Sequence, residues 1–213
     1  MCDSRELIEL TIEHTKDSIE FFSEKKKKER ERAVCRAFLR FLGVPFTESE
    51  LDVRIDDDPP DVCFRAARFE ILEVLDKDRP RHRELKEFLK RLSGMKCDSE
   101  LWQDLPDYQS LSVAQVVHLV ESKLLPKARK YGPGLCSSLD ALVYVNLRHT
   151  SLQPSRTLET ISAIACQGWR SVSVVFAPFS YVCYARPKAP DFLGCNMGAL
   201  RKEWKWPDTA FSL

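Results

Sequence analysis

The segment from Asp56 to Asp76, DDDPPDVCFRAARFEILEVLD, constrains the fold more than any other part of the chain. Two apolar runs, Val62–Arg65 and Arg68–Leu75, are separated by only a few residues, so we expect them to pair as an antiparallel hairpin. Pro59 and Pro60 precede the first run, where their missing N–H donors disturb no strand pairing. The segment therefore predicts a hairpin that follows a turn rich in aspartate and proline.

The predicted hairpin carries two carboxylates, Asp61 at its start and Glu70 in its second strand. Side chains alternate along a strand, so Glu70 shares a face with Leu72, while Phe69 and Ile71 point to the other face. Two carboxylates from adjacent strands form a hard oxygen site suited to Mg²⁺. We expect the two carboxylates to approach each other only if the sheet bends there. The alternative is an ordinary hairpin whose exposed carboxylates only increase solubility.

The residues Pro60, Asp61 and Glu70 resemble the P-D…(D/E)-x-K signature of the restriction-endonuclease-like nuclease superfamily. The wider run PPDVCF…RFEILEVLDKDRPRH is similar to a bacterial family of unknown function described as candidate endonucleases. The resemblance extends over most of the chain, but only this central segment is specific. It implies an α/β fold with a mixed central sheet flanked by helices. It also implies hydrolysis of phosphodiester bonds with Mg²⁺ or Mn²⁺ bound by Asp61 and Glu70.

One position departs from the signature, because Leu72 stands where the superfamily has lysine. A lysine there stabilises developing charge, and leucine can supply no such charge. In the superfamily this role can migrate to a nearby helix, which makes Lys123 and Lys127 the candidates for catalysis. A glutamate on the helix before the hairpin often completes the metal site. Glu31 matches that position best, Glu29 second, and the backbone carbonyl of Ile71 is a further candidate ligand.

The rest of the chain alternates between helical and strand patterns. Apolar residues at steps of three and four predict helix from Ser4 to about Leu42, interrupted near the run of four lysines at 25–28. Leu51, Val53 and Ile55 alternate as in a half-buried strand. These patterns place a helical region and a first strand before the hairpin.

Beyond the hairpin, Ser112 and Gln115 form a capping-box pattern that begins another helix, in which we expect Pro126 to kink or end a part. Gly132–Gly134 is expected to break the chain, and the apolar run Leu139–Leu147 then predicts a strand buried on both faces, parallel to its neighbour. A helix over Leu158–Cys166 and a strand pair near 172–176 and 181–185 are expected to follow. We therefore expect a single α/β domain over residues 1–213 with an N-terminal helical extension of about residues 1–30.

A basic segment follows the predicted hairpin and contains Lys77, Arg79, Arg81, His82 and Lys86. The common interpretation of such a segment is a solvated loop and helix start. The functional interpretation is a clamp on the phosphates of a nucleic acid, with DNA favoured. Because the formal net charge is only +1, nucleic-acid binding would depend on local patches of this kind.

The eight cysteines form no C-x-x-C pair, and most lie in apolar runs. With no secretory signal pattern and no apolar run near the ~20 residues that span a bilayer, we expect reduced thiols in a cytoplasmic protein without a membrane partner. The sequence does not decide between a monomer, a homodimer and a complex with a protein partner.

Three functional hypotheses remain open at this level. The first is a metal-dependent endonuclease in which a cation from elsewhere replaces the lysine missing at Leu72. The second is a catalytically inactive protein of nuclease fold that binds nucleic acid or a protein. The third is a small α/β interaction protein whose carboxylates have no role in a metal site.

Overall fold

The computed structural model describes residues 4–54, 58–77, 79–102, 108–153 and 168–202. The chain divides into two compact units, one of Met1–Arg30 with Lys77–Tyr108 and one of Glu31–Asp76 with Gln109–Leu213. The boundary after Arg30 coincides with the end of the N-terminal extension expected from the sequence. Lys77–Tyr108 was not expected to join that extension. The single-domain organisation stays a prediction.

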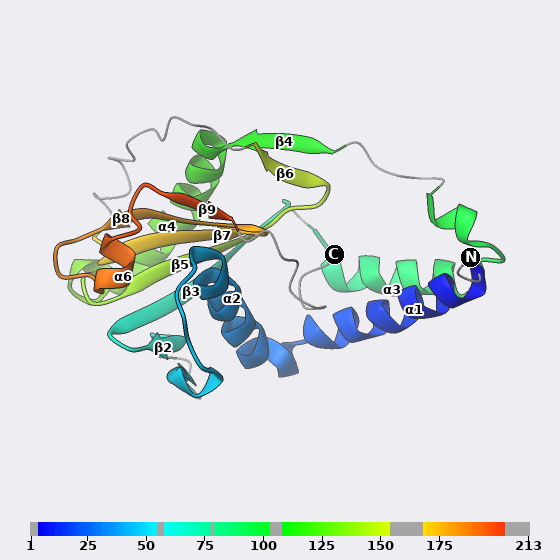
Figure 1. Cartoon of the computed structure of the whole chain (residues 1–213), viewed down its shortest axis with the longest axis horizontal. Helices are drawn as coiled ribbons and strands as arrows, with labels where there is room; N and C mark the ends of the chain where they lie inside the picture. The colour runs from blue at the N-terminus through cyan, green and yellow to red at the C-terminus, as the bar shows by residue number, and fades with distance from the viewer. Residues whose placement is uncertain (1–3, 55–57, 78, 103–107, 154–167, 203–213) are drawn as a thin grey trace. The chain divides into compact units, whose positions relative to one another are not determined.

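The larger unit is built on a mixed sheet with the strand order β1-β2-β3-β5-β7-β8-β9 (Figure 1). The central strands β3, β5 and β7 are parallel, and the outer pairs on both sides are antiparallel. This arrangement confirms the expected α/β class with a mixed central sheet. The strands are β1 (Leu51–Val53), β2 (Val62–Phe64), β3 (Ala67–Leu75), β5 (Asp140–Asn146), β7 (Ser171–Phe176), β8 (Phe179–Ala185) and β9 (Leu200–Lys202).

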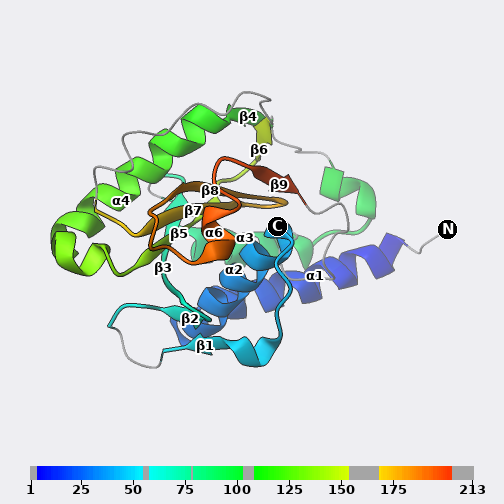
Figure 2. The same cartoon turned by 60° about the vertical axis from the view of Figure 1, so that its left-hand side comes forward.

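Two helices cover the two faces of this sheet, α2 (Lys27–Leu42) and α4 (Val113–Cys136) (Figure 2). On the α2 face, the buried side chains of the helix pack with Phe69 and the half-buried Ile71 of β3. On the α4 face, the helix packs with Leu72 and Val74. The predicted alternation of side chains along β3 is therefore confirmed. Residues an even number of positions from Leu72 in this strand point to the α4 face.

A tight connection joins β2 to β3. Phe64 pairs with Ala67, and Arg65 between them adopts a left-handed φ of 51°. The register ends with the pair Val62 and Phe69, and the backbone N–H of Asp61, just before β2, donates to the carbonyl oxygen of Phe69 at 2.9 Å. The expectation that the carboxylates of Asp61 and Glu70 approach each other through a bend in the sheet stays a prediction.

The return from β3 to its parallel neighbour β5 includes α4, as the sequence predicted. The Ser112 hydroxyl accepts a hydrogen bond from the backbone N–H of Gln115 at 3.3 Å, which confirms the predicted capping box. Pro126 does not end the helix. The helical conformation is interrupted at Gly132, whose φ of 72° and ψ of 165° suit a residue without a Cβ atom.

Several short elements were not anticipated. β4 (Gln109–Ser112) and β6 (Thr150–Gln153) form a separate parallel pair.

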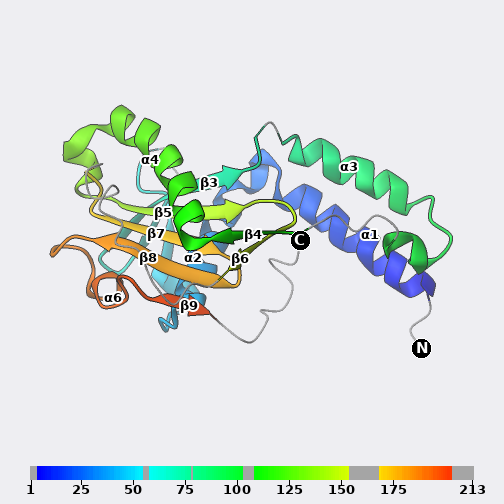
Figure 3. The same cartoon turned by 90° about the horizontal axis from the view of Figure 1, so that it is seen from above.

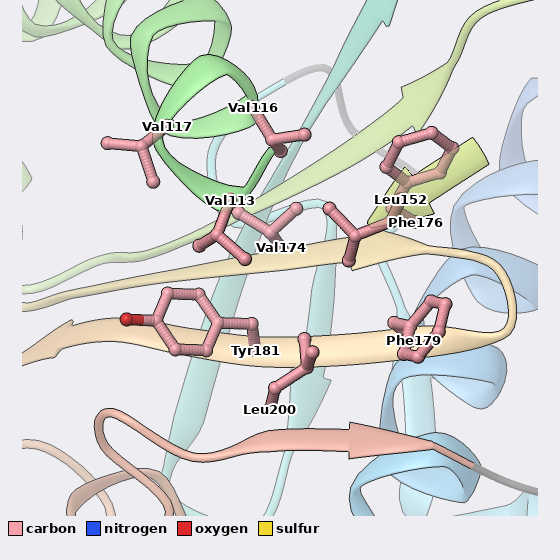
Figure 4. A pocket seen from close by; sticks show the side chains of 9 residues that line it. All are labelled: Val113, Val116, Val117, Leu152, Val174, Phe176, Phe179, Tyr181 and Leu200. Atoms are coloured by element: carbon pink, nitrogen blue, oxygen red, sulfur yellow. The ribbon is translucent and has the colours of Figure 1, made fainter. Parts of the chain in front are cut away.

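An apolar pocket lies near this pair and is lined by α4, β6, β7, β8 and β9 (Figure 4). It contains about 300 Å³ of space between atoms, part of it open to solvent. The remaining short helices of this unit are η2 (Glu48–Glu50) and α6 (Asp191–Gly194). The expected helix over Leu158–Cys166 and the residue Ile55 lie outside the described residues.

A buried ion pair joins β5 to β7. Asp140 is fully buried and accepts hydrogen bonds from the guanidinium of Arg170, from the Ser171 hydroxyl at 2.7 Å and from the backbone N–H of Arg68 at 2.8 Å. Arg170 also donates to the carbonyl oxygen of Ala66 at 2.9 Å. The Asp140 carboxylate thus connects three neighbouring strands, a role that the sequence analysis did not identify.

The smaller unit contains two helices that lie side by side, α1 (Ser4–Phe21) and α3 (Arg81–Leu92) (Figure 3). Two short 3₁₀ helices complete it, η1 (Glu24–Lys26) and η3 (Asp98–Trp102). The break between α1 and α2 falls at the lysine run, where the sequence predicted an interruption. The guanidinium of Arg81 stacks over the ring of Phe22 at 3.8 Å.

The six cysteines in the described part of the chain carry free thiols, and Cys35, Cys136 and Cys183 are buried. Burial raises the pKa values of the Cys35 and Cys183 thiols well above their ordinary value, so these side chains behave as small apolar core residues. None of the helices in the described ranges combines the length and the hydropathy that a membrane span requires.

Candidate functional site

Glu70 lies at the centre of the candidate site. Glu70 is two residues before Leu72 in β3, so its side chain points to the same α4 face, and only 3% of the residue is exposed. An isolated buried carboxylate would be costly, so it requires a cation or hydrogen-bond donors. α4 supplies both, and they reach the same oxygen atom of Glu70.

Lys127 provides the cation. Its Nζ lies 2.8 Å from Oε1 of Glu70, and its side chain is 30% exposed. Burial opposes the charge of this ammonium, but the hydrogen bond and attraction to Glu70 outweigh that effect and raise the pKa of Lys127. Lys127 therefore carries its charge throughout the neutral range, in direct contact with Glu70.

Tyr131, one helical turn after Lys127, provides the second donor. Its hydroxyl donates to Oε1 of Glu70 at 2.8 Å. Burial, together with the nearby Glu70, raises the pKa of Tyr131 to about 12. Tyr131 is not among the site residues predicted from the sequence. The available signal was its spacing of four residues from Lys127, which places both side chains on one side of a helix.

Asp61 lies directly before β2, the strand adjacent to β3. Its backbone N–H donates to the carbonyl of Phe69 at 2.9 Å, and its Oδ2 accepts from the N–H of Ile71 at 2.8 Å. Its carboxylate therefore lies against the backbone that immediately follows Glu70. The structure thus brings Lys127 into contact with Glu70 and places Asp61 against Ile71, the residue after Glu70. All three residues were predicted from the sequence.

The other predicted site residues of the larger unit are not part of this contact. Lys123, one turn before Lys127, is exposed and makes no salt bridge to any described residue. Leu72 packs with the apolar cluster beneath α4. Glu31 is buried on α2, the helix that covers the opposite face of the sheet from α4.

The two carboxylates are candidate ligands for a divalent cation. Mg²⁺ prefers oxygen ligands and is often held by one or two carboxylates, with water and substrate phosphates completing its shell. Asp61 and Glu70 suit that chemistry, since Oε2 of Glu70 accepts no hydrogen bond from any described residue. The described ranges contain no group of three or more His, Cys, Asp or Glu that could hold a metal ion, so Glu31 does not gather with the other two.

The predicted basic segment belongs to the smaller unit, where its members differ in their surroundings. Arg79 pairs with Glu84 at 3.1 Å, and Arg81 stacks on Phe22. Lys77, His82 and Lys86 are exposed. The two exposed lysines are available to contact phosphates, whereas the two arginines already have partners within their own unit.

Comparison with solved structures shows one similar architecture. It is a protein of unknown function from Pseudomonas aeruginosa strain PAO1, described as a member of the monooxygenase superfamily. It is 27% identical, with a TM-score of 0.66, over 95% of this chain and 97% of the other. The shared fold therefore extends over nearly the whole of both chains. No match was found among the curated proteins.

Comparison with protein families gives a match over residues 3–203. The matching family is described as "Putative endonuclease, protein of unknown function (DUF1780)". Since the match covers nearly the whole chain, the protein belongs to this family.

Proposed function

We propose that this protein is a metal-dependent endonuclease that hydrolyses phosphodiester bonds in nucleic acid, with DNA as the favoured substrate. The observation that carries the proposal is the 2.8 Å contact between Nζ of Lys127 and Oε1 of Glu70. It supplies a positive charge beside the second carboxylate of the signature, although the chain has Leu72 at the signature lysine. The family description supports the same class of reaction.

Asp61 and Glu70 would hold the cation, which we propose to be Mg²⁺ or Mn²⁺. When bound, such an ion activates water and offsets the charge that develops during displacement at phosphorus. The N–H of Ile71 holds Oδ2 of Asp61, and Lys127 and Tyr131 hold Oε1 of Glu70. The ammonium of Lys127 adds fixed positive charge at the place where the substrate phosphate becomes more negative.

We also propose that the protein belongs to the restriction-endonuclease-like superfamily. We infer a restriction-endonuclease-like arrangement for two reasons. Asp61 directly precedes β2 and accepts through Oδ2 from the backbone N–H of Ile71, the residue after Glu70 in the antiparallel neighbour β3, and β3 continues through α4 to a parallel strand. In this arrangement α4 is the helix to which the lysine has migrated. Lys127 fits that role by its contact, whereas Lys123 does not reach Glu70.

Substrate contacts are proposed for α3 in the smaller unit. His82, Lys86 and Lys90 are exposed and follow each other at four-residue steps, so they form one row along the helix. Neither lysine pairs with an acidic side chain among the described residues. Neighbouring phosphates on a nucleic acid offer a complementary row of negative charge.

A lysine exchange tests the catalytic proposal. Lys127→Met should lower the rate of Mg²⁺-dependent cleavage by about 10²–10³, the usual cost of losing one charge-stabilising group. Adding Leu72→Lys to Lys127→Met returns a lysine to the signature position and should recover part of that loss. Lys123→Met, on the same helix one turn earlier, is the matched control and should cleave like the wild type.

The outcomes separate the competing functions. Cleavage that survives Asp61→Ala would show that the site is elsewhere. Binding of DNA without cleavage, and without a rise of the melting temperature in Mg²⁺, would favour an inactive nucleic-acid-binding protein of the same fold. A ligand that binds the native state must raise the melting temperature at sufficient concentration, so this measurement tests metal binding independently of activity.

A further inference from the structure

The hydrogen-bond donors around Glu70 are distributed unequally between its two carboxylate oxygens. Lys127 and Tyr131 both bind Oε1, each at 2.8 Å. Oε2 has no hydrogen-bond partner in the described part of the chain. The arrangement fixes the orientation of the carboxylate while leaving one oxygen available to another ligand.

Tyr131 is also held in place by packing on its ring. Its ring packs edge-on against the fully buried ring of Trp169, with centroids 6.3 Å apart and an interplanar angle of 65°. Nζ of Lys127 lies 5.0 Å from the centre of the same ring. Directly after Tyr131, Gly132 interrupts the helix with a φ of 72°. The hydroxyl is therefore directed at Glu70 by packing on its own ring and by the end of the regular helix.

We infer that Tyr131 is a positioning residue for the divalent cation, acting through Glu70. Together with Lys127 it holds Oε1 of Glu70, so that Oε2 remains available to bind the cation next to Asp61. This inference rests on the proposed metal site. It assigns to Tyr131 a role that the P-D…(D/E)-x-K signature does not include.

A purely structural role for Tyr131 is the competing explanation. A hydroxyl that only satisfies a buried carboxylate would contribute to stability and nothing else. Groups that orient a metal ligand have a different effect, because their removal commonly weakens metal affinity or activity by about 10–100-fold. Metal affinity therefore distinguishes the two roles, whereas the melting temperature alone does not.

The experiment measures Mn²⁺ binding to the full chain by electron paramagnetic resonance, with no nucleic acid present. Tyr131→Phe keeps the ring against Trp169 and removes only the hydroxyl. We expect its Kd for Mn²⁺ to rise by about 10–100-fold. Tyr181→Phe is the matched control, since Tyr181 is a buried tyrosine that lines the apolar pocket and does not contact Glu70. Its Kd should equal that of the wild type.

Cleavage kinetics over a range of Mn²⁺ concentrations up to saturation provide a second readout. The loss in Tyr131→Phe should shrink as Mn²⁺ is raised, while KM for DNA stays unchanged, because the hydroxyl acts on the metal ligand and not on the substrate. Should Tyr131→Phe fail to fold, Trp169→Phe is the second variant. It keeps the hydroxyl on a less supported ring, and weaker Mn²⁺ binding is expected there too.

The possible results are distinguishable. A wild-type protein that binds no Mn²⁺ would refute the metal site itself, and with it the proposed function. A wild type that binds Mn²⁺, combined with an unchanged Kd in Tyr131→Phe, would overturn the role of Tyr131 alone. If that variant does not fold, an unchanged Kd in Trp169→Phe has the same meaning.

Discussion

Lys127 and Glu70 form a salt bridge between α4 and the central strand β3, with Nζ 2.8 Å from Oε1. The carboxylate side chain is 4% exposed and the lysine side chain 30%. The buried carboxylate needs the cation in the folded state, and Glu70 is also the residue that resembles the second acidic position of the nuclease signature. The contact therefore bears both on stability and on the proposed activity.

Replacing Lys127 should therefore reduce stability as well as activity. Lys127→Met leaves the Glu70 charge buried without its cation, and we expect a loss of about 3 kcal/mol in the free energy of unfolding. This is the lower end of the range for broken buried pairs, because Lys127 is partly exposed. The measurement is unfolding in urea. Adding Glu70→Gln to Lys127→Met should restore part of the loss, and Lys123→Met should have no effect.

The Asp140–Arg170 pair offers a prediction about stability alone. Arg170→Met leaves a fully buried carboxylate without its cation, which should cost about 3–5 kcal/mol. The control is Arg148→Met, because the Arg148–Asp76 pair is much more exposed, and such a pair contributes only about 0–1 kcal/mol. Equal losses of unfolding free energy in the two variants would contradict the importance assigned to burial.

Salt dependence tests the row of cations on α3. Lys86→Ala with Lys90→Ala should weaken DNA binding regardless of sequence, and each lost phosphate contact should reduce the slope of log K against log salt by about 0.9. Binding is measured between about 50 and 200 mM salt. Lys188→Ala removes an exposed lysine of the larger unit and serves as the control. An unchanged slope in the double variant would remove α3 from the substrate-binding surface.

Alkaline pH should destabilise the protein. The pKa of Tyr131 is raised to about 12, mainly by burial, and that of Lys127 is raised by Glu70 despite burial. A raised folded-state pKa means that the folded form holds the proton more tightly. The resulting stability is complete below the unfolded values of about 10 for Tyr and 10.4 for Lys, and it is lost as the pH rises through the folded values.

This pH effect can be assigned by comparing variants. Tyr181 also has a pKa raised to about 12 by burial, and the buried thiols of Cys35 and Cys183 act in the same direction. Melting temperatures of the wild type should therefore fall above about pH 10. Tyr131→Phe and Tyr181→Phe should each show a shallower fall than the wild type. A fall as steep in Tyr131→Phe as in the wild type would mean that Tyr131 does not contribute.

The sequence by itself determined the features that depend on neighbouring residues. The β2–β3 hairpin, the alternation of Phe69 and Leu72 between faces and the Ser112 cap all follow from local spacing, because strand periodicity and capping involve residues close in the chain. The parallel return to β5 was also predictable, since it followed from a helix placed between two strand-like runs.

Only the tertiary structure decided what lies beside Glu70. Lys123 and Lys127 are one helical turn apart on the same side of α4, so helical spacing alone does not show which of them contacts Glu70. They are displaced by about 6 Å along the helix, and only Lys127 makes the contact, while Lys123 is exposed. The packing of α4 on β3 selected Lys127 and added Tyr131, just as the assembly of the central strands brought Arg170 to Asp140. Buried charges find their partners across the fold, because removing a carboxylate from water is tolerated only where a distant part of the chain supplies the compensating donors.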